Sequence, residues 1–157
     1  MTAEYSGTQP DDGTGGLLAW DPINQKEKWR IQHPTPWHGG TLATGGDLVF
    51  QGTGEGVFYA YDSSNGDALW SFNTQRGITG APSTYMRDGV QHIVLPVGWG
   101  GQASFGLPPF QKNGWKYKGP GIRLLSFSLQ GKNRLPQIKD NRFSFNPIEI
   151  TEEAVID

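Results

Sequence analysis

Two short runs that combine tryptophan with glycine are the most distinctive residues of this 157-residue chain. Trp37 comes just before a glycine pair at residues 39–40. Trp99 stands between Gly98 and a second glycine pair at residues 100–101. Because glycine has no Cβ atom, each run lets an indole ring and a close backbone approach one another. On residue type alone, such indoles are more typical of core packing than of ligand binding.

The titratable residues predict neither a catalytic residue nor a metal ligand in this chain. His33, His38 and His92 have no second ligand at the spacing that metal sites use. Asp21 and Asp62 repeat at positions that are typical of turns. We therefore interpret all five as structural, with a polar role for His38 beside the first tryptophan run as the alternative. No Ser–His–Asp arrangement is indicated.

Composition excludes several classes of protein. The chain has no cysteine, which excludes a disulfide scaffold, Cys-ligated zinc, an iron–sulfur cluster and covalently attached haem. The longest apolar run, residues 93–97, is far shorter than the roughly 20 residues of a membrane span. Residues 1–12 lack the basic and apolar regions of a signal peptide. A net charge of −2 argues against binding to nucleic acid.

Charge is unevenly distributed along the chain. Residues 1–111 carry five basic against ten acidic side chains, whereas residues 112–142 carry eight basic residues against Asp140 alone. We interpret residues 112–142 as a solvated surface. The alternative is a docking patch for an acidic partner or an anionic headgroup.

A repeat of 41 residues predicts the organisation that must position these residues. The run at residues 17–21 returns at residues 58–62, and Trp29 returns as Trp70. Each copy is an apolar run ending in Ala-aromatic-Asp, then a polar turn, then a tryptophan that opens a second apolar run, which is typical of a β-hairpin. A partial third copy without the tryptophan lies at residues 124–129.

These hairpins and the runs between them predict an all-β chain of four-stranded β-propeller blades. Further strands are expected at residues 47–53, 83–86 and 91–97, and residues 52–56 are expected to form a hairpin turn. Turns are assigned to Asn65-Gly66 and Asp88-Gly89, and to Pro22 and Asn24 in the first hairpin. We predict that Trp29 and Trp70 pack between blades, against a neighbouring blade at the alanine position of the repeat.

The sequence resembles a known family at these motifs. The pattern Ala-x-Asp-x-x-x-Gly-x-x-x-Trp, complete from Ala60 to Trp70 and looser from Ala19 to Trp29, resembles the tryptophan-docking motif of quinoprotein dehydrogenases. The run at residues 37–53, with those at 81–85 and 97–101, is similar to the C-terminal blades of the PQQ-dependent methanol and ethanol dehydrogenases. The resemblance covers residues 15–136.

The resemblance implies a function for the two tryptophan runs. In that family, the positions matching Trp37, Gly98 and Trp99 contact pyrroloquinoline quinone (PQQ). It further implies alcohol oxidation by hydride transfer to PQQ, with Ca²⁺ activating the quinone. The catalytic base and the calcium ligands are expected outside this chain, which is therefore expected to be inactive in isolation.

The resemblance also implies partners. These are a small alcohol substrate, a separate cytochrome c-type electron acceptor and the remaining propeller blades. It implies a periplasmic location as well. The alternatives to this enzyme are a non-enzymatic propeller scaffold built from the same repeat and a small domain that oligomerises into a ring.

Three regions flank or interrupt the blades. They are a flexible segment at 1–14, an insertion at 102–121 that is expected to wall the substrate or acceptor entrance, and a tail at 137–157.

Overall fold

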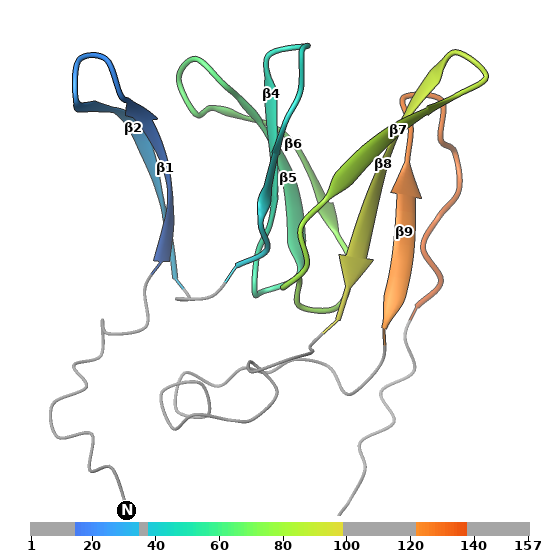
Figure 1. Cartoon of the computed structure of the whole chain (residues 1–157). Helices are drawn as coiled ribbons and strands as arrows, with labels where there is room; N and C mark the ends of the chain where they lie inside the picture. The colour runs from blue at the N-terminus through green and yellow to red at the C-terminus, as the bar shows by residue number, and fades with distance from the viewer. Residues whose placement is uncertain (1–14, 35–37, 99–121, 138–157) are drawn as a thin grey trace, which may run out of the picture.

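The computed structural model describes residues 15–34, 38–98 and 122–137, and in these ranges the chain consists of β-strands and their connections (Figure 1). The strands form three antiparallel sheets that stand side by side. In chain order they are β1 (Gly15–Asp21), β2 (Lys26–His33), β3 (Thr41–Ala43), β4 (Leu48–Gly52), β5 (Val57–Asp62), β6 (Ala68–Asn73), β7 (Ser83–Arg87), β8 (Val90–Val97) and β9 (Arg123–Phe127).

The middle sheet is a complete four-stranded blade. Its strands follow one another in the order β3-β4-β5-β6, each antiparallel to the next. The first sheet contributes the pair β1-β2 and the third contributes β7-β8-β9. The strands expected at residues 47–53, 83–86 and 91–97 are therefore confirmed, as is the hairpin turn at 52–56, which joins β4 to β5.

The turns explain how short polar segments reverse the chain. Asp88 and Gly89 both have positive φ (51° and 75°), and Gly66 has a φ of 82°, as the Asp-Gly and Asn-Gly pairs predict. In the first hairpin the positive φ falls on Gln25 (51°), so the assignment of that turn to Pro22 and Asn24 was incomplete. Gln25 occupies the place that Gly66 has in the next repeat.

Asp21 and Asp62 stabilise these turns, as expected. The Asp21 carboxylate accepts hydrogen bonds from the backbone N–H groups of Ile23 and Asn24, at 3.0 and 3.1 Å, and from the Asn24 side chain. Asp62 accepts from the backbone and the hydroxyl of Ser64. These hydrogen bonds favour the ionised form, so the Asn24 contacts lower the pKa of Asp21 and the Ser64 contacts lower that of Asp62.

Trp29 links the first sheet to the middle sheet, which confirms the expected packing between blades. Its indole N–H donates to the carbonyl of Ser63, at 3.0 Å. A Cβ atom on Gly66 would lie 2.9 Å from the indole ring, so glycine is what lets the ring lie on this turn. The expectation that the ring packs at the alanine position was wrong in this respect: Trp29 lies on Gly66, and Ala60 is the cross-strand partner of Trp70 in its own sheet.

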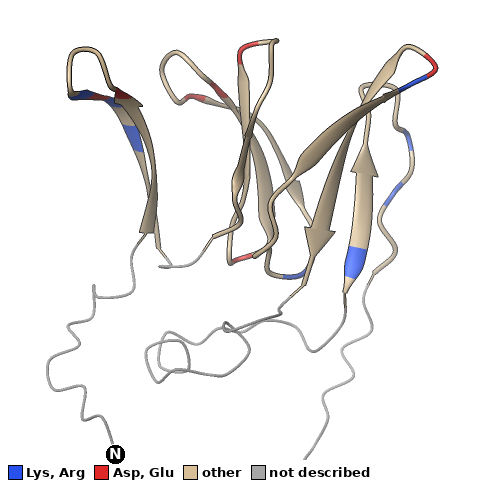
Figure 2. Ribbon diagram, viewed as in Figure 1, with Lys and Arg blue, Asp and Glu red and all other residues tan. Residues whose placement is uncertain are grey.

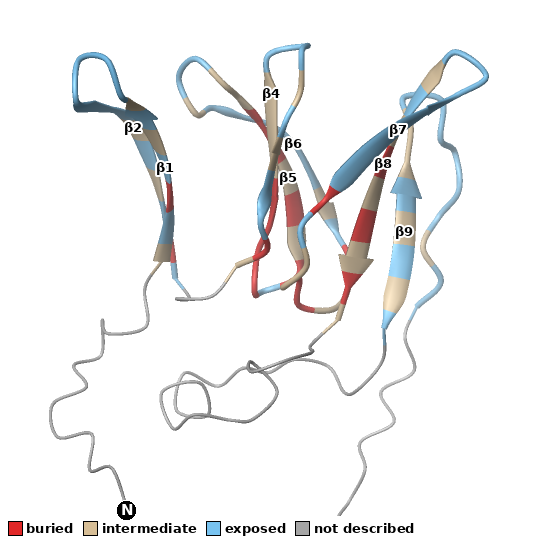
Figure 3. Ribbon diagram, viewed as in Figure 1, coloured by how far each residue is buried: buried red, intermediate tan, exposed pale blue. Residues whose placement is uncertain are grey.

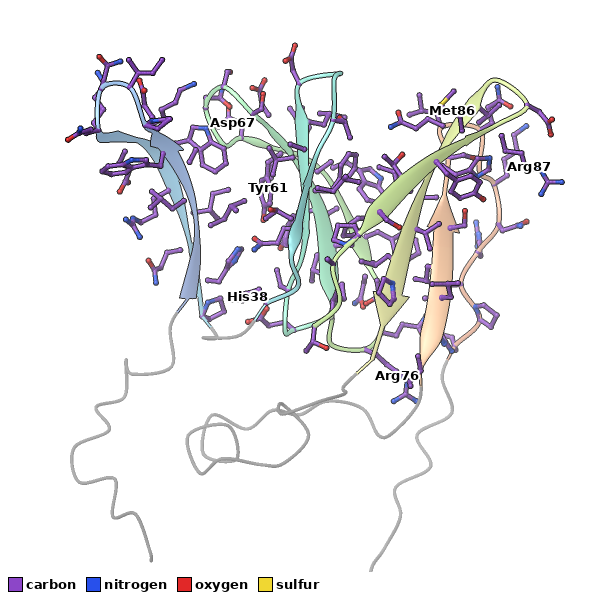
Figure 4. All side chains as sticks on the ribbon, viewed as in Figure 1. His38, Tyr61, Asp67, Arg76, Met86 and Arg87 are labelled. Atoms are coloured by element: carbon purple, nitrogen blue, oxygen red, sulfur yellow. The ribbon has the colours of Figure 1, made fainter. Side chains whose placement is uncertain are left out.

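Aromatic rings join the middle sheet to the third sheet. Trp70 lies edge-on to Phe58 of β5 and to Phe127 of β9, with ring centroids 6.1 and 5.7 Å apart. Phe58 belongs to the buried core between these sheets, together with Ile78, Ile93, Leu95 and Val97 (Figure 3). On the other side of the sheet Tyr61 is 2% exposed and faces the first sheet (Figure 4), and burial raises its pKa.

Several expectations lie outside the described residues. They concern Trp37 and Trp99, the segment 1–14, the insertion at 102–121 and all but the first residue of the tail at 137–157. In the described ranges no helix is long and apolar enough to cross a membrane.

Candidate functional site

The described residues of the two tryptophan–glycine runs, 38–40 and 98, lie at the same end of the sheets. In an antiparallel sheet of consecutive strands, every second connection lies at the same end. That end therefore carries the connection between β2 and β3, the β4–β5 turn, the segment between β6 and β7, and the end of β8 (Figure 1). His38 and Arg76 both lie there (Figure 4). We call this the glycine-rich end of the sheets.

Residues 77–80, here called the connecting segment, lie between the middle and third sheets at this end. The Ile78 N–H donates to the carbonyl of Thr53 in the β4–β5 turn, at 3.0 Å. On the other side, Ile78 forms a parallel bridge with Gly98, whose N–H donates to the Gly77 carbonyl at 2.9 Å. The connecting segment is therefore hydrogen-bonded to both sheets.

Glycine permits close packing where the first run meets this segment. The Gly39 N–H donates to the Gly52 carbonyl at 2.9 Å, and a Cβ atom on Gly39 would lie 2.6 Å from the Gly80 carbonyl oxygen. A Cβ atom on Gly52 would overlap the side chain of Ile78, which is fully buried. Gly39 and Gly98 therefore both contact the connecting segment, although they are far apart in the sequence.

Two linked hydrogen bonds between buried polar side chains and the backbone hold Gly39 in place. The Gln51 amide nitrogen lies 3.5 Å from the Gly39 carbonyl, and its oxygen lies 3.0 Å from Nε2 of His33. With the amide in this orientation, His33 must carry a proton on Nε2 and donate it. His33 and Gln51 are each 5% exposed.

His33 and His38 are brought together in a way that the sequence did not reveal. Their ring centroids are 4.3 Å apart. Nδ1 of His38 accepts a hydrogen bond from the backbone N–H of Gly54, at 3.3 Å, so neutral His38 carries its proton on Nε2. Their spacing of five residues in the sequence gave no sign of this pairing.

The third histidine, His92, lies on β8 in the third sheet. His92 stacks on Tyr85, with ring centroids 5.0 Å apart, and its Nδ1 lies 3.4 Å from the Ser126 hydroxyl. These contacts join the three strands of the third sheet.

The described charged side chains at the glycine-rich end are mostly basic. Among the described residues, Glu55 in the β4–β5 turn is the one acidic side chain there. The basic ones are Arg76, between β6 and β7, and Arg123, the partner of Val97 at the end of β8; Figure 2 shows where charged residues lie on the ribbon. The described ranges contain no group of three His, Asp or Glu residues that could hold a metal ion. The described residues of this end therefore do not supply the six to eight oxygen ligands that calcium needs.

Blades of this kind, with tryptophans docked on the next sheet, define a β-propeller protein. Residues 13–93 match the family model described as the β-propeller domain of glucose, ethanol and alcohol dehydrogenases that use PQQ. The chain belongs to this family.

Relatives and solved structures agree with this assignment. The chain is 47% identical over 124 residues to quinohemoprotein alcohol dehydrogenase ADH IIB of Pseudomonas putida, a match that covers 78% of this chain and 18% of that protein. It is 42% identical to the crystal structure of the quinohemoprotein alcohol dehydrogenase of Comamonas testosteroni, with a TM-score of 0.67, covering 80% of this chain and 18% of that structure. A europium-containing methanol dehydrogenase is 30% identical with a TM-score of 0.69, covering 76% of this chain and 24% of that one.

The chain spans about a fifth of the length of the relatives it matches. In the described ranges, one complete blade and two incomplete ones leave sheet faces and edges without partners, and a propeller closes with roughly four to eight blades. Exposed apolar side chains on the outer strands, such as Leu124 at 73% and Leu69 at 59%, are what a longer propeller would cover.

Proposed function

We propose that this chain supplies the C-terminal blades of a PQQ-dependent alcohol dehydrogenase, in which Trp37, Gly98 and Trp99 contact the quinone. One observation carries the proposal: Gly39 and Gly98, which belong to the two tryptophan–glycine runs, are anchored to one connecting segment. One described glycine of each run thus contacts the same segment, which supports the assignment of Trp37, Gly98 and Trp99 that the family resemblance implies.

The residues at the glycine-rich end fit such a ligand. PQQ is a flat quinone with three carboxylates, so its site requires aromatic surfaces, close backbone and donors for anions. Gly98 supplies close backbone, whereas the space beside Gly39 and Gly52 is taken by the connecting segment. Arg76 (Figure 4) and Arg123, the partner of Val97 at the end of β8, add positive charge at the same end. When bound, PQQ would supply a hydride acceptor for the alcohol, and Ca²⁺ would supply a Lewis acid beside the quinone.

We place the calcium ligands and the catalytic base in other blades of the complete protein. The described residues offer Glu55 as the one carboxylate at the glycine-rich end, which is insufficient for a calcium site. The role of this chain is then to position the quinone ring rather than to carry out proton transfer. In isolation it would not oxidise alcohols.

The same proposal assigns the partners. The substrate is a small alcohol, and the electrons pass to a separate cytochrome c-type acceptor in the periplasm. The apolar insertion at 102–121, which follows Gly98 and Trp99 directly, is proposed to wall the substrate or acceptor entrance. The names of several relatives, quinohemoprotein alcohol dehydrogenase among them, favour this enzyme over a non-enzymatic scaffold.

Reconstitution of the full-length protein that contains this chain, here called the complete protein, tests the proposal. We expect the apoprotein to bind one PQQ per chain in the presence of Ca²⁺ and then to reduce an artificial electron acceptor only when an alcohol is added. Omission of either PQQ or Ca²⁺ is the control and should abolish the activity. Saturable PQQ binding without alcohol oxidation would contradict the assigned reaction, and absence of PQQ binding would contradict the proposal as a whole.

A further inference from the structure

We infer that Thr79 is a positioning residue for the proposed cofactor site, acting through the backbone of Gly98. The inference rests on the proposed function of Gly98. It concerns a residue of the connecting segment that neither the repeat nor the tryptophan–glycine runs contain.

Gly98 has a backbone conformation that must be held in place. Its φ is 138°, a value that residues with a side chain rarely adopt, and it follows the regular strand β8 directly. A glycine at the end of a strand has many accessible conformations, so selecting one of them carries an entropic cost. The direction in which the chain leaves β8 depends on what fixes this residue.

Both polar backbone groups of Gly98 bond to the connecting segment. Its N–H donates to the carbonyl of Gly77 at 2.9 Å, and its carbonyl accepts the hydroxyl of Thr79 at 3.2 Å. The partners of these two hydrogen bonds, Gly77 and Thr79, lie on either side of Ile78. The bonds therefore restrain the peptide units before and after the Gly98 Cα atom. Together they fix both torsion angles of that residue.

The Thr79 hydroxyl is itself held rigidly. The preceding residue, Ile78, is fully buried and bonded to Thr53, and the following residue, Gly80, packs closely on Pro96 of β8. Threonine is branched at Cβ, which restricts its side-chain torsion further. The hydroxyl is therefore a preorganised donor, and it sets the plane of the peptide that leads from Gly98 to the next residue.

Thr79→Val in the complete protein tests this inference, because valine keeps the shape and removes the donor. We expect the dissociation constant of PQQ to rise by about three- to tenfold, as the loss of one hydrogen bond predicts. Amide exchange at Gly98, followed by mass spectrometry on its peptide, should become faster. Thr79→Ser keeps the hydroxyl and should leave PQQ affinity within about twofold of the wild type. If valine disturbs the fold, Thr79→Ala removes the same donor without adding a methyl group.

Thr84→Val is the matched control. The Thr84 hydroxyl also donates to a carbonyl of β8, that of His92 at 2.9 Å, but it lies away from the glycine-rich end. This variant should have unchanged PQQ affinity. Equal PQQ affinity and equal Gly98 exchange in Thr79→Val and the wild type would overturn the inference. A wild-type protein that binds no PQQ would instead overturn the proposed function, while the exchange rate at Gly98 would still report on Thr79.

Discussion

Replacing Ile78 with alanine should lower the free energy of unfolding by about 2–5 kcal/mol, the range for truncating a buried isoleucine. Ile78 has no exposed surface, and its side chain fills the space that glycine leaves at Gly39 and Gly52. The cavity would therefore open at the point where both tryptophan–glycine runs meet the connecting segment. The measurement is hydrogen exchange of the complete protein, because it separates local from global loss of stability.

The exchange data should show a specific pattern. Peptides that contain Gly39 and Gly98 should lose protection more than peptides from the β1–β2 hairpin, since the two glycines bond to or pack on the connecting segment. Ile23→Ala is the control: that side chain is 89% exposed, and its loss should change stability by no more than about 0.5 kcal/mol. Unchanged protection at both glycines in Ile78→Ala would show that the connecting segment does not hold the two runs together.

Trp99→Ala in the complete protein should weaken PQQ binding by about 30- to 1,000-fold, which corresponds to the roughly 2–4 kcal/mol of a tryptophan at the centre of a binding site. The proposed reason is loss of the flat surface against which the quinone rests. Trp99→Phe keeps a smaller flat ring and should lose much less affinity. Titration of the apoprotein with PQQ, followed by absorbance, measures both variants.

A tryptophan away from the proposed site provides the comparison for this experiment. Trp20 lies on β1, is 53% exposed, and its replacement by alanine should leave PQQ affinity unchanged. If Trp99→Ala binds PQQ as tightly as the wild type, the residue does not contact the cofactor. If Trp20→Ala weakens binding as strongly, the effect of Trp99→Ala cannot be assigned to direct contact.

Much of the fold could be predicted because the same short sequence pattern occurs twice and defines a hairpin each time. An apolar run, a capping aspartate and a tryptophan at a spacing of 41 residues define hairpins, and the structure has strands at those positions. The partner of Trp29 could not be found in this way. Alanine and glycine are both small, and only the packing of neighbouring sheets places Gly66, rather than Ala60, beneath the ring.

The candidate site was predictable only in part. Tryptophan and glycine mark two runs in the sequence, but the segment that connects them has neither a period nor a distinctive composition. The Ile78 N–H donates to the Thr53 carbonyl and the Thr79 hydroxyl donates to the Gly98 carbonyl, and such bonds depend on tertiary structure alone. The pairing of His33 with His38 escaped prediction for the same reason, since the contact between their rings also depends on tertiary structure.

A structure of the complete protein with PQQ bound would test the central claim most directly, namely that this end of the sheets faces the quinone. We predict that the ring of PQQ lies in van der Waals contact, at about 3.5–4 Å, with the backbone of Gly98 and with the indoles of Trp37 and Trp99. Density for PQQ at the opposite end of these sheets, or separated from Gly98 by other side chains, would contradict the account.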